Sequence, residues 1–276
     1  MMKLGCHLSV ANGFYKAGLQ AVSIGANSFQ FFTRNPRGGK AKALDQGDLD
    51  KLKTLMETHD FGHLLAHGSY TMNLCSNKEE TRTYAKELLK DDLKRVAMIP
   101  GAIYVFHPGS HVKQGTEKGI EYIIQALNEA ITEPSDVIVC LEAMSGKGTE
   151  IGRSFEELSQ IIQGVKHNEN LGVCIDTCHL YSAGYDIVND LDKVLDDFNT
   201  IIGLDRLKAV HLNDSKMPFA SNKDRHEKIG QGSIGLDGVI KMINHPVFRD
   251  VPFNLETPNE ISGYAEEIKL LRSHLI

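Results

Sequence analysis

The stretch Val173–His179, VCIDTCH, is a short apolar run that ends in a carboxylate and carries an imidazole three residues later. Val173–Asp176 has the pattern of a short buried strand that is entered from Gly172. Placing a carboxylate and an imidazole at the end of a buried strand costs free energy unless each finds a partner. Two interpretations are open at this point. Asp176 and His179 either bond to each other or are both metal ligands.

Strand-like and helix-like segments alternate along the whole chain on both sides of this stretch. Short apolar runs predict strands at residues 2–8, 28–32, 64–66, 103–106, 137–141, 173–176, 207–212 and 253–255. Apolar residues at helical spacing predict helices at residues 13–24, 47–58, 78–98, 116–131, 154–165, 191–202, 236–243 and 260–275. A long polar loop is expected at residues 213–233, after the seventh strand.

Eight successive strand–helix units predict a parallel sheet, and eight is the number of strands that closes a TIM barrel. We therefore expect an α/β fold in which residues 1–276 form a single (β/α)8 barrel domain. The alternative is an open, doubly wound sheet, which would bind its ligand at one crevice and draw on fewer strands. The positions of the polar residues should distinguish the two.

Titratable side chains gather at the predicted carboxyl ends of the strands, where barrel enzymes carry their active sites. Seven of the eight predicted strands end at or near one of these residues: His7, His67, His107, Glu142, Asp176, His211 and Glu256. Chance placement of His, Asp and Glu would put them at far fewer strand ends. One such histidine alone is more often a hydrogen-bonded loop residue than a ligand, but together they form a ring of nitrogen and oxygen donors.

Three further donors lie off the strands. His179 is expected in a loop after the sixth strand, and Asp224 and His226 lie in the long polar loop. Their i, i+2 spacing lets an extended segment aim both side chains the same way. Imidazole and carboxylate ligands suit zinc best, then manganese or iron. Such a donor set is too large for one ion and fits two or three, an arrangement typical of phosphoester hydrolysis.

The overall composition restricts the class of protein. The formal net charge of -6 argues against binding nucleic acid through overall basicity, although bound divalent ions would make the site itself positive. No apolar run approaches the length of a membrane span, and the first residues lack a signal-peptide layout. The five cysteines form no C-x-x-C pair, so we expect reduced thiols in a cytoplasmic protein.

Several segments resemble those of the endonuclease IV family, the apurinic/apyrimidinic (AP) endonucleases of DNA base-excision repair. The match includes CIDTCH, HLND and D-R-H in this order and runs over almost the whole chain. It comprises residues 5–9, 33–37, 67–70, 106–111, 141–142, 173–179, 210–214, 224–226, 229–235 and 255–257.

The resemblance implies a barrel that binds three Zn²⁺ ions, with Mn²⁺ or Fe²⁺ as an alternative at one site. One ion would bind His67 and His107, and Glu142 would bridge it to a second ion. The remaining ligands would be Asp176, His211 and Glu256 for the second ion, and His179, Asp224 and His226 for the third. Glu142 is therefore also the expected catalytic residue, because the bridged pair would activate the attacking water.

The implied reaction is hydrolysis of the phosphodiester 5′ to an abasic site, which leaves a 3′-hydroxyl and a 5′-deoxyribose phosphate. The implied partner is double-stranded DNA that contains abasic sites, and the implied state is a monomer. Arg37 and Tyr70 match the side chains that the family inserts into the DNA beside the lesion. Gly38-Gly39 follows Arg37 where relatives often carry a bulky residue, and Thr71 follows Tyr70 where an apolar wedge is common. Ala143-Met144 replaces a more usual small polar pair.

Two other functions are open. Sugar isomerases and epimerases of related barrels arrange similar ligands around one or two divalent ions. Such an isomerase would not need the third set, His179 with Asp224 and His226. Outside enzymes, the same residues would suit a zinc-dependent damage-binding protein without turnover.

Overall fold

A computed structural model describes residues 2–276 of the chain. Eight parallel strands form one sheet in the order β1-β10-β7-β6-β5-β4-β3-β2. They are β1 Leu4–Cys6, β2 Gln30–Phe32, β3 Leu64–His67, β4 Ala102–Phe106, β5 Val139–Glu142, β6 Leu171–Asp176, β7 Leu207–His211 and β10 Phe253–Leu255. A parallel bridge between His7 and Gln30 joins the two outermost strands of this order, so the sheet closes on itself. The predicted barrel is confirmed.

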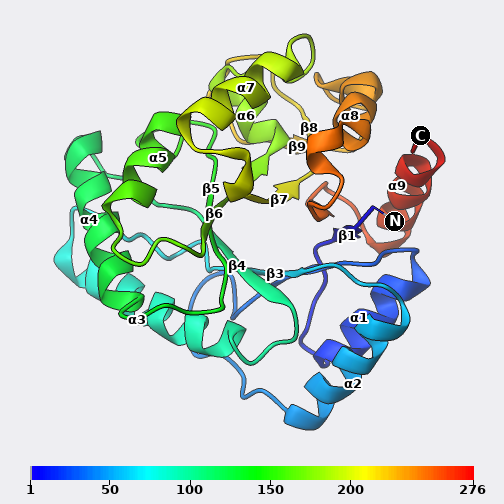
Figure 1. Ribbon diagram of the computed structural model, residues 1–276, viewed down its shortest axis with the longest axis horizontal. Coiled ribbons are helices and arrows are strands. Elements are labelled where there is room, and N and C mark those ends of the chain that lie inside the picture. The colour runs from blue at the N-terminus through cyan, green and yellow to red at the C-terminus, as the bar shows by residue number, and fades with distance from the viewer. Residues whose placement is uncertain (1) are drawn as a thin grey trace.

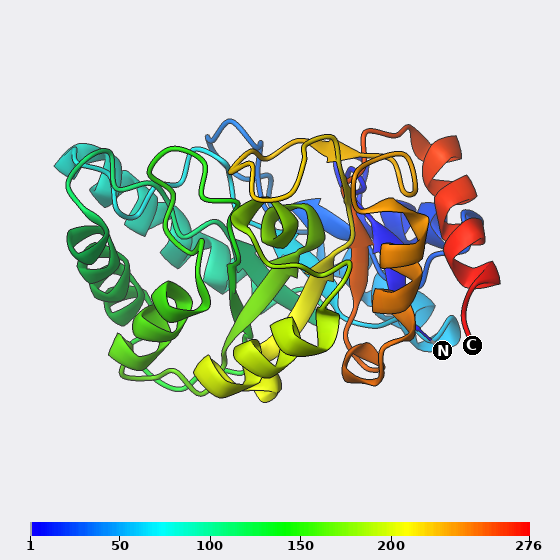
Figure 2. The same cartoon turned by 90° about the horizontal axis from the view of Figure 1, so that it is seen from above.

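Helices follow the strands and surround the sheet, with the strands at the centre of the molecule (Figure 1; Figure 2). They are α1 Phe14–Ser23, α2 Gln46–Thr58, α3 Glu79–Val96, α4 Thr116–Ala130, α5 Phe155–Gly164, α6 Thr177–Ala183, α7 Leu191–Ile201, α8 Gly235–Asn244 and α9 Ile261–Ser273. Two short 3₁₀ turns, Leu204–Arg206 and Pro246–Phe248, precede β7 and β10. Within residues 2–276, none of the helices has the length and apolar character needed to cross a bilayer.

The core has two parts, because each strand shows one face to the barrel interior and the other to the helices. The interior is filled by small and branched side chains, namely Leu65, Ile103, Val105, Cys140, Cys174 and Ala209. Larger residues such as Phe29, Phe31 and Phe253 pack in the layer between the sheet and the helices. The barrel is thus solid at its centre, and a ligand can reach only its ends.

The expected loop after β6 is wrong, because the helix α6 begins directly at Thr177. Asp176 is its N-cap, and the Asp176 carboxylate accepts a hydrogen bond of 3.0 Å from the backbone N–H of His179. Gly184 ends the helix with a φ of 103°, a backbone conformation that glycine adopts without strain. A helix of seven residues is too short to show a helical repeat in the sequence. The cap residues Asp176 and Gly184 were the signals that could have indicated its two ends.

The expected loop at residues 213–233 also contains structure. Asp214–Ser215 (β8) and His226–Glu227 (β9) form a two-stranded antiparallel pair. Asp214 pairs with Glu227, and Ser215 pairs with His226. Two-residue strands carry no periodic signal in a sequence. Their pairing returns the chain to the barrel mouth, so His226 lies beside the strand ends although it is far from β7 along the loop.

A buried ion pair holds the loop after β2 against α3. Arg34 donates through Nε to Asp92 Oδ1 at 3.0 Å, and Tyr104 donates to Asp92 Oδ2 at 3.0 Å. The side chains of Arg34 and Asp92 are 3% and 0% exposed. Arg34 also donates to the carbonyl of Gly39 at 3.1 Å. The pair therefore fixes the loop that carries Arg37.

We expect Asp92→Ala to lower the free energy of unfolding by about 3–5 kcal/mol, because it leaves the Arg34 guanidinium buried without its main partner. Chemical denaturation of both proteins measures this difference. Asp91→Ala is the matched control, since Asp91 pairs with the same guanidinium but is 56% exposed. It should cost no more than about 1 kcal/mol. Equal losses in the two variants would contradict a buried pair as the anchor of the loop.

Candidate metal centre

Parallel strands bring the predicted ligands to one end of the barrel. His67, Glu142, Asp176 and His211 are the last residues of β3, β5, β6 and β7. His107 and Glu256 follow the last residues of β4 and β10 directly. The barrel mouth thus gathers six of the nine predicted ligands from six different strands. The remaining three come from α6 and from the loop after β7.

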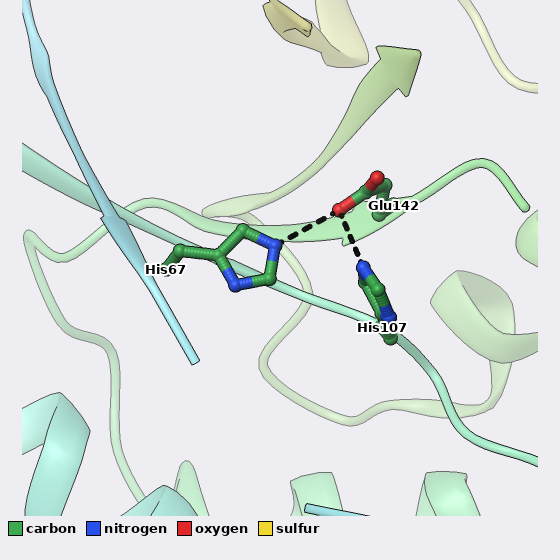
Figure 3. A group of neighbouring side chains, drawn as sticks. All are labelled: His67, His107 and Glu142. Atoms are coloured by element: carbon green, nitrogen blue, oxygen red, sulfur yellow. Dashed lines mark hydrogen bonds and ion pairs between the residues drawn. The ribbon is translucent and has the colours of Figure 1, made fainter. Parts of the chain in front are cut away.

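Glu142 lies at the centre of the site and is fully buried. Its Oε2 is 3.2 Å from Nε2 of His67 and 3.3 Å from Nε2 of His107 (Figure 3). Its Oε1 is 3.2 Å from Nδ1 of His211 and 3.2 Å from Nδ1 of His179. One carboxylate oxygen therefore faces one histidine pair, and the other oxygen faces a second pair. Because His179 faces the third group through Nε2, the contacts that fit a carboxylate bridging two ions are those of Oε2 with His67 and His107 and of Oε1 with His211.

A second group of donors shares Glu142. His211 Nδ1 lies 3.5 Å from Oε2 of Glu256 and 3.9 Å from Oδ2 of Asp176. One ligand atom from each of Glu142, Asp176, His211 and Glu256 falls within 4.8 Å of the others. The structure therefore places together the four residues assigned to the second ion by resemblance.

The third group lies beside the second. Oδ1 of Asp224 is 3.4 Å from Nε2 of His179 and 3.3 Å from Nε2 of His226. Oδ2 of Asp176 is also 3.5 Å from Nε2 of His226. His179, His226 and Asp176 offer ligand atoms within 4.8 Å of one another. Asp176 therefore lies within reach of two groups, which the sequence alone did not indicate.

The unpartnered atoms of the site suit metal ions. Among residues 2–276, five buried side-chain polar atoms have no hydrogen-bond partner, and four of them belong to the predicted ligands. They are Glu142 Oε1, His179 Nε2, His211 Nδ1 and His226 Nε2. Each such atom costs about 1–3 kcal/mol when it is buried alone. Zinc bonds to the same donor types, so the residues present fit the group that the resemblance implies.

In three of the rings the second nitrogen has its own partner, and this partner sets which nitrogen is free for a metal. Nδ1 of His67 bonds to the carbonyl of Gly68 at 2.7 Å. Nδ1 of His179 bonds to the carbonyl of Ala143 at 3.1 Å, and Nδ1 of His226 bonds to the carbonyl of Glu256 at 3.2 Å. A carbonyl accepts only, so each Nδ1 donates, and in the neutral ring the lone pair is then on Nε2.

Three of the four carboxylates of the site, those of Glu142, Asp224 and Glu256, are held in their charged form. Burial alone would raise the pKa of Glu142, but His211 and His107 outweigh it and hold this pKa well below its usual range. Burial would likewise raise the pKa of Asp224 and of Glu256, and the neighbouring His179 and His211 respectively lower both. Ionised carboxylates are the form that a cation binds. These three carboxylates are therefore in the form that binds a cation near neutral pH.

The cysteines beside these ligands are poor candidates. One donor group contains Cys178 with Asp224 and His226. Burial, however, raises the pKa of Cys174 and of Cys178 to about 11, so both thiols are protonated near neutral pH. All five cysteines are free and buried. The expectation of reduced thiols is met.

We expect Cys178→Ala to bind as much zinc as the unchanged chain, because His179, Asp224 and His226 supply the third group without the thiol, which donates to the carbonyl of Arg225 at 3.6 Å. Zinc per chain, measured by plasma mass spectrometry after dialysis, tests this. Loss of one ion in the Cys178→Ala protein would show instead that the thiol is a ligand of the third site.

His7 is the one strand-end residue that falls outside the donor groups. Its Nδ1 lies 3.1 Å from the amide nitrogen of Gln30 and 4.0 Å from Oε1 of Glu256. Burial lowers its pKa to about 4, which Glu256 only partly offsets. The imidazole is therefore neutral and its Nδ1 accepts a hydrogen bond from Gln30, a role for which its position in the sequence gave no sign.

Two buried residues that the sequence did not single out support the ligands. Asn213 donates to Oδ2 of Asp176 at 2.7 Å and accepts from the backbone N–H of Glu256 at 2.9 Å. The Asp214 carboxylate accepts from backbone N–H groups of the glycine-rich segment 229–235, at Gly230, Gly232, Ile234 and Gly235. It thereby holds together the long loop that carries Asp224 and His226. In the sequence, the HLND segment at the end of a predicted buried strand was the signal that could have identified Asn213 and Asp214.

The two predicted DNA-contact residues lie on neighbouring loops. Arg37 is exposed, and Tyr70 is 59% exposed. The Tyr70 ring packs against His67 and His107 at centroid distances of 5.7 and 5.6 Å. The backbone N–H of Tyr70 donates to the carbonyl of Pro36 at 3.2 Å, which joins the two loops. Their contact with DNA remains a prediction.

The departures at Gly38 and Thr71 are connected. Gly38 has a φ of 91°, and a Cβ at this position would lie 2.9 Å from Oγ1 of Thr71. A larger residue would therefore be strained and would press on the threonine. The absence of a side chain at Gly38 therefore leaves room for the Thr71 hydroxyl on the neighbouring loop.

The donor groups open to solvent through a cleft of about 470 Å³. Two cationic side chains, Lys147 and Arg225, line it together with Tyr70 and members of the donor groups. The Glu150 carboxylate lines the cleft as well, so the residues around the donor groups carry both signs of charge. Lys147 and Arg225 are the groups that suit an anionic substrate such as a phosphodiester.

Comparisons with known proteins agree with this geometry. The family described as "Xylose isomerase-like TIM barrel" matches residues 19–274. A protein of Alkaliphilus oremlandii named "Probable endonuclease 4" is 58% identical over 272 residues, which cover 99% of this chain and 97% of the relative. A protein of the same name from Clostridium beijerinckii is 57% identical, with 99% of each chain covered.

Solved structures give the same result. Endonuclease IV from Thermus thermophilus superposes with a TM-score of 0.87 at 33% identity, covering 99% of this chain and 98% of that one. A D-tagatose 3-epimerase-like protein superposes with a TM-score of 0.75 but at 19% identity, so that likeness concerns the fold alone. By its sequence and its barrel, the chain belongs to the endonuclease 4 family of xylose isomerase-like TIM barrels.

Proposed function

We propose that this chain is an AP endonuclease of base-excision repair, which hydrolyses the DNA phosphodiester 5′ to an abasic site. The products would be a 3′-hydroxyl and a 5′-deoxyribose phosphate. The observation that carries the proposal is the buried Glu142 carboxylate, whose two oxygens each face two histidines in a site with four unpartnered ligand atoms. Similarity to proteins named endonuclease 4 over 99% of the chain supports it.

Three zinc ions would suit the three donor groups. His67 and His107 would hold one ion, Glu142 would join it to a second ion, and the remaining ligands would follow the grouping given above. Zinc bound there supplies an activated water at neutral pH and positive charge for the phosphate. Mn²⁺ or Fe²⁺ remains an alternative at one site, because both accept the same imidazole and carboxylate donors.

The protein's own part is positioning and exclusion of water. Glu142 would hold the attacking water between the two groups that it joins, and its depressed pKa keeps it ionised for this role. Lys147 and Arg225 at the rim would pair with neighbouring phosphates.

Recognition of the lesion would depend on shape. An abasic nucleotide has no base to stack, so it leaves the duplex at the lowest cost. Tyr70 stands exposed beside His67 and His107, at the place where an extruded sugar would enter the cleft. We propose that Tyr70 and Arg37 enter the gap in double-stranded DNA beside the lesion.

Sugar isomerisation is not favoured. The epimerase-like relatives share the fold at under 25% identity. In the third donor group, Oδ1 of Asp224 lies 3.4 Å from Nε2 of His179 and 3.3 Å from Nε2 of His226. An isomerase that binds one or two ions would not need this group. A damage-binding protein without turnover is also not favoured, because each of the nine predicted ligands belongs to one of the groups of neighbouring donors, which supports a complete catalytic site. We further propose a monomer that acts in the cytoplasm, where buried free thiols such as those found here stay reduced.

The proposal is tested by incubating the zinc-loaded chain with a duplex oligonucleotide that bears one tetrahydrofuran abasic analogue. We expect a single incision on the 5′ side of the analogue, and a 3′ end that DNA polymerase can extend without further processing. The same duplex with an ordinary base is the control and should stay intact. An intact abasic duplex, combined with conversion of ketose sugars, would contradict the proposal and support an isomerase.

A further inference from the structure

Gln30 carries a side-chain amide into the centre of the metal site. It is the first residue of β2 and is fully buried. Its Nε2 lies 2.5 Å from Oε1 of Glu256 and 3.1 Å from Nδ1 of His7. Its Oε1 lies 2.6 Å from Nε2 of His211. One neutral side chain thus touches two of the four residues in the second donor group.

The chemistry of these partners fixes the orientation of the amide. A carboxylate only accepts hydrogen bonds, so the NH₂ group of Gln30 must face Glu256. The amide oxygen then faces His211, and because this oxygen only accepts, Nε2 of His211 must carry a proton. In the neutral ring, the lone pair is then on Nδ1. This is the buried unpartnered atom that lies 3.2 Å from Oε1 of Glu142.

His211 therefore differs from the other histidines of the site. His67, His179 and His226 bond to backbone carbonyls through Nδ1 and present Nε2 to the donor groups. His211 presents Nδ1, and its partner is a side chain. A backbone carbonyl orients only the ring that bonds to it. The Gln30 amide instead bonds to both the His211 ring and the Glu256 carboxylate, and so fixes the two side chains relative to each other.

We propose that Gln30 is a positioning residue that selects the Nδ1-binding tautomer of His211 and holds Glu256 beside it for the second metal ion. The inference rests on the metal centre of the proposed function, but it does not depend on the nuclease reaction. Partners of this kind typically raise metal affinity by about 10–100-fold. Gln30 adds this orientation without adding charge to a site that already contains four carboxylates.

Two variants separate the roles of the amide. Gln30→Leu keeps a similar volume but removes the acceptor for His211 and the donor for Glu256. Gln30→Glu keeps an acceptor for Nε2 of His211 but places a second carboxylate against Glu256. Ser28→Ala is the matched control, because Ser28 lies two residues earlier, is also fully buried and bonds to the carbonyl of His63 at 2.8 Å.

The first measurement is zinc affinity. The full chain and each variant are freed of metal and titrated with Zn²⁺ against a chromophoric chelator, with circular dichroism to verify folding. We expect Gln30→Leu to bind one of three ions about 10–100-fold more weakly, and Ser28→Ala to bind all three as the unchanged chain does. A Gln30→Leu protein that binds three ions with unchanged affinity would overturn the inference.

The second measurement is nitrogen NMR of zinc-loaded protein labelled with ¹⁵N-histidine, which distinguishes rings bound through Nδ1 from rings bound through Nε2. We expect one Nδ1-bound ring in the unchanged chain and in Gln30→Glu, and none in Gln30→Leu. Only Nε2-bound rings in the unchanged chain would overturn the inference even if Gln30→Leu failed to fold. An unchanged chain that binds no zinc would instead contradict the metal centre of the proposed function and this inference together.

Discussion

Glu142→Gln is expected to lower the rate constant for incision of an abasic duplex by at least about 10³-fold while the chain stays folded. The amide has the shape of the carboxylate but only one oxygen and no charge. It therefore cannot face His67 and His107 with one anionic oxygen, and His179 and His211 with the other. Loss of the bridge removes the position at which water would be activated. Single-turnover kinetics on the tetrahydrofuran duplex measures the effect.

Glu150→Gln is the matched control for this variant. Glu150 lines the same cleft, and its carboxylate accepts from the backbone N–H of Lys147 at 2.9 Å rather than from a donor group. We expect a much smaller change in the rate constant. Comparable losses in the two variants would show that the cleft responds to any lost carboxylate, and the central role of Glu142 would then be wrong.

His179→Ala is expected to remove one zinc ion and to lower the incision rate constant by about 10²–10³-fold. Nε2 of His179 lies 3.4 Å from Asp224, and no neighbouring imidazole among the described residues replaces it in the third group. The histidine extends from the short helix α6, so its removal leaves the barrel strands unchanged. Zinc per chain, circular dichroism and single-turnover kinetics measure the three expectations.

His245→Ala is the control for His179→Ala, because His245 follows α8 and bonds to Asp192 away from the donor groups. It should keep three ions and full activity. A His179→Ala protein with three ions and unchanged activity would show that the third group has no part in the reaction, and a two-ion mechanism would then be the better description.

The alternation of strands and helices was predictable because each element is encoded locally. Leu49, Leu52 and Leu55 lie on one face of α2, and Ser154 caps α5 by accepting from the backbone N–H of Glu157 at 3.3 Å. Parallel strands then bring their carboxyl ends together, so the ring of donors follows from the fold without knowledge of any distance. This is why the ligands were predictable as a set.

The supporting residues were not predictable in the same way. Gln30 and Glu256 are in contact although 226 residues separate them along the chain. Arg34 and Asp92 pair over 58 residues, and each alone resembles an ordinary surface charge in the sequence. Such partners are set by the closure of the barrel and by side-chain orientation. A pattern in a single sequence indicates contacts only between residues that lie within a few positions of each other along the chain.

The position of Asp176 shows the same limit at shorter range. The sequence places it at a strand end, but its Oδ1 caps α6 while its Oδ2 lies 2.7 Å from Asn213 and 3.5 Å from His226. The carboxylate is therefore shared between a helix terminus, a supporting amide and the third donor group. Only the three-dimensional arrangement shows that one residue joins all three.

The central claim is a three-ion centre built from imidazole and carboxylate ligands, and anomalous diffraction at the zinc absorption edge tests it most directly. Crystals of the zinc-loaded chain should show three peaks at the barrel mouth. One peak should lie between His67, His107 and Glu142, one among Glu142, His211 and Glu256, and one beside His179, Asp224 and His226. A single peak, or a peak bound to the Cys178 thiolate, would contradict the account.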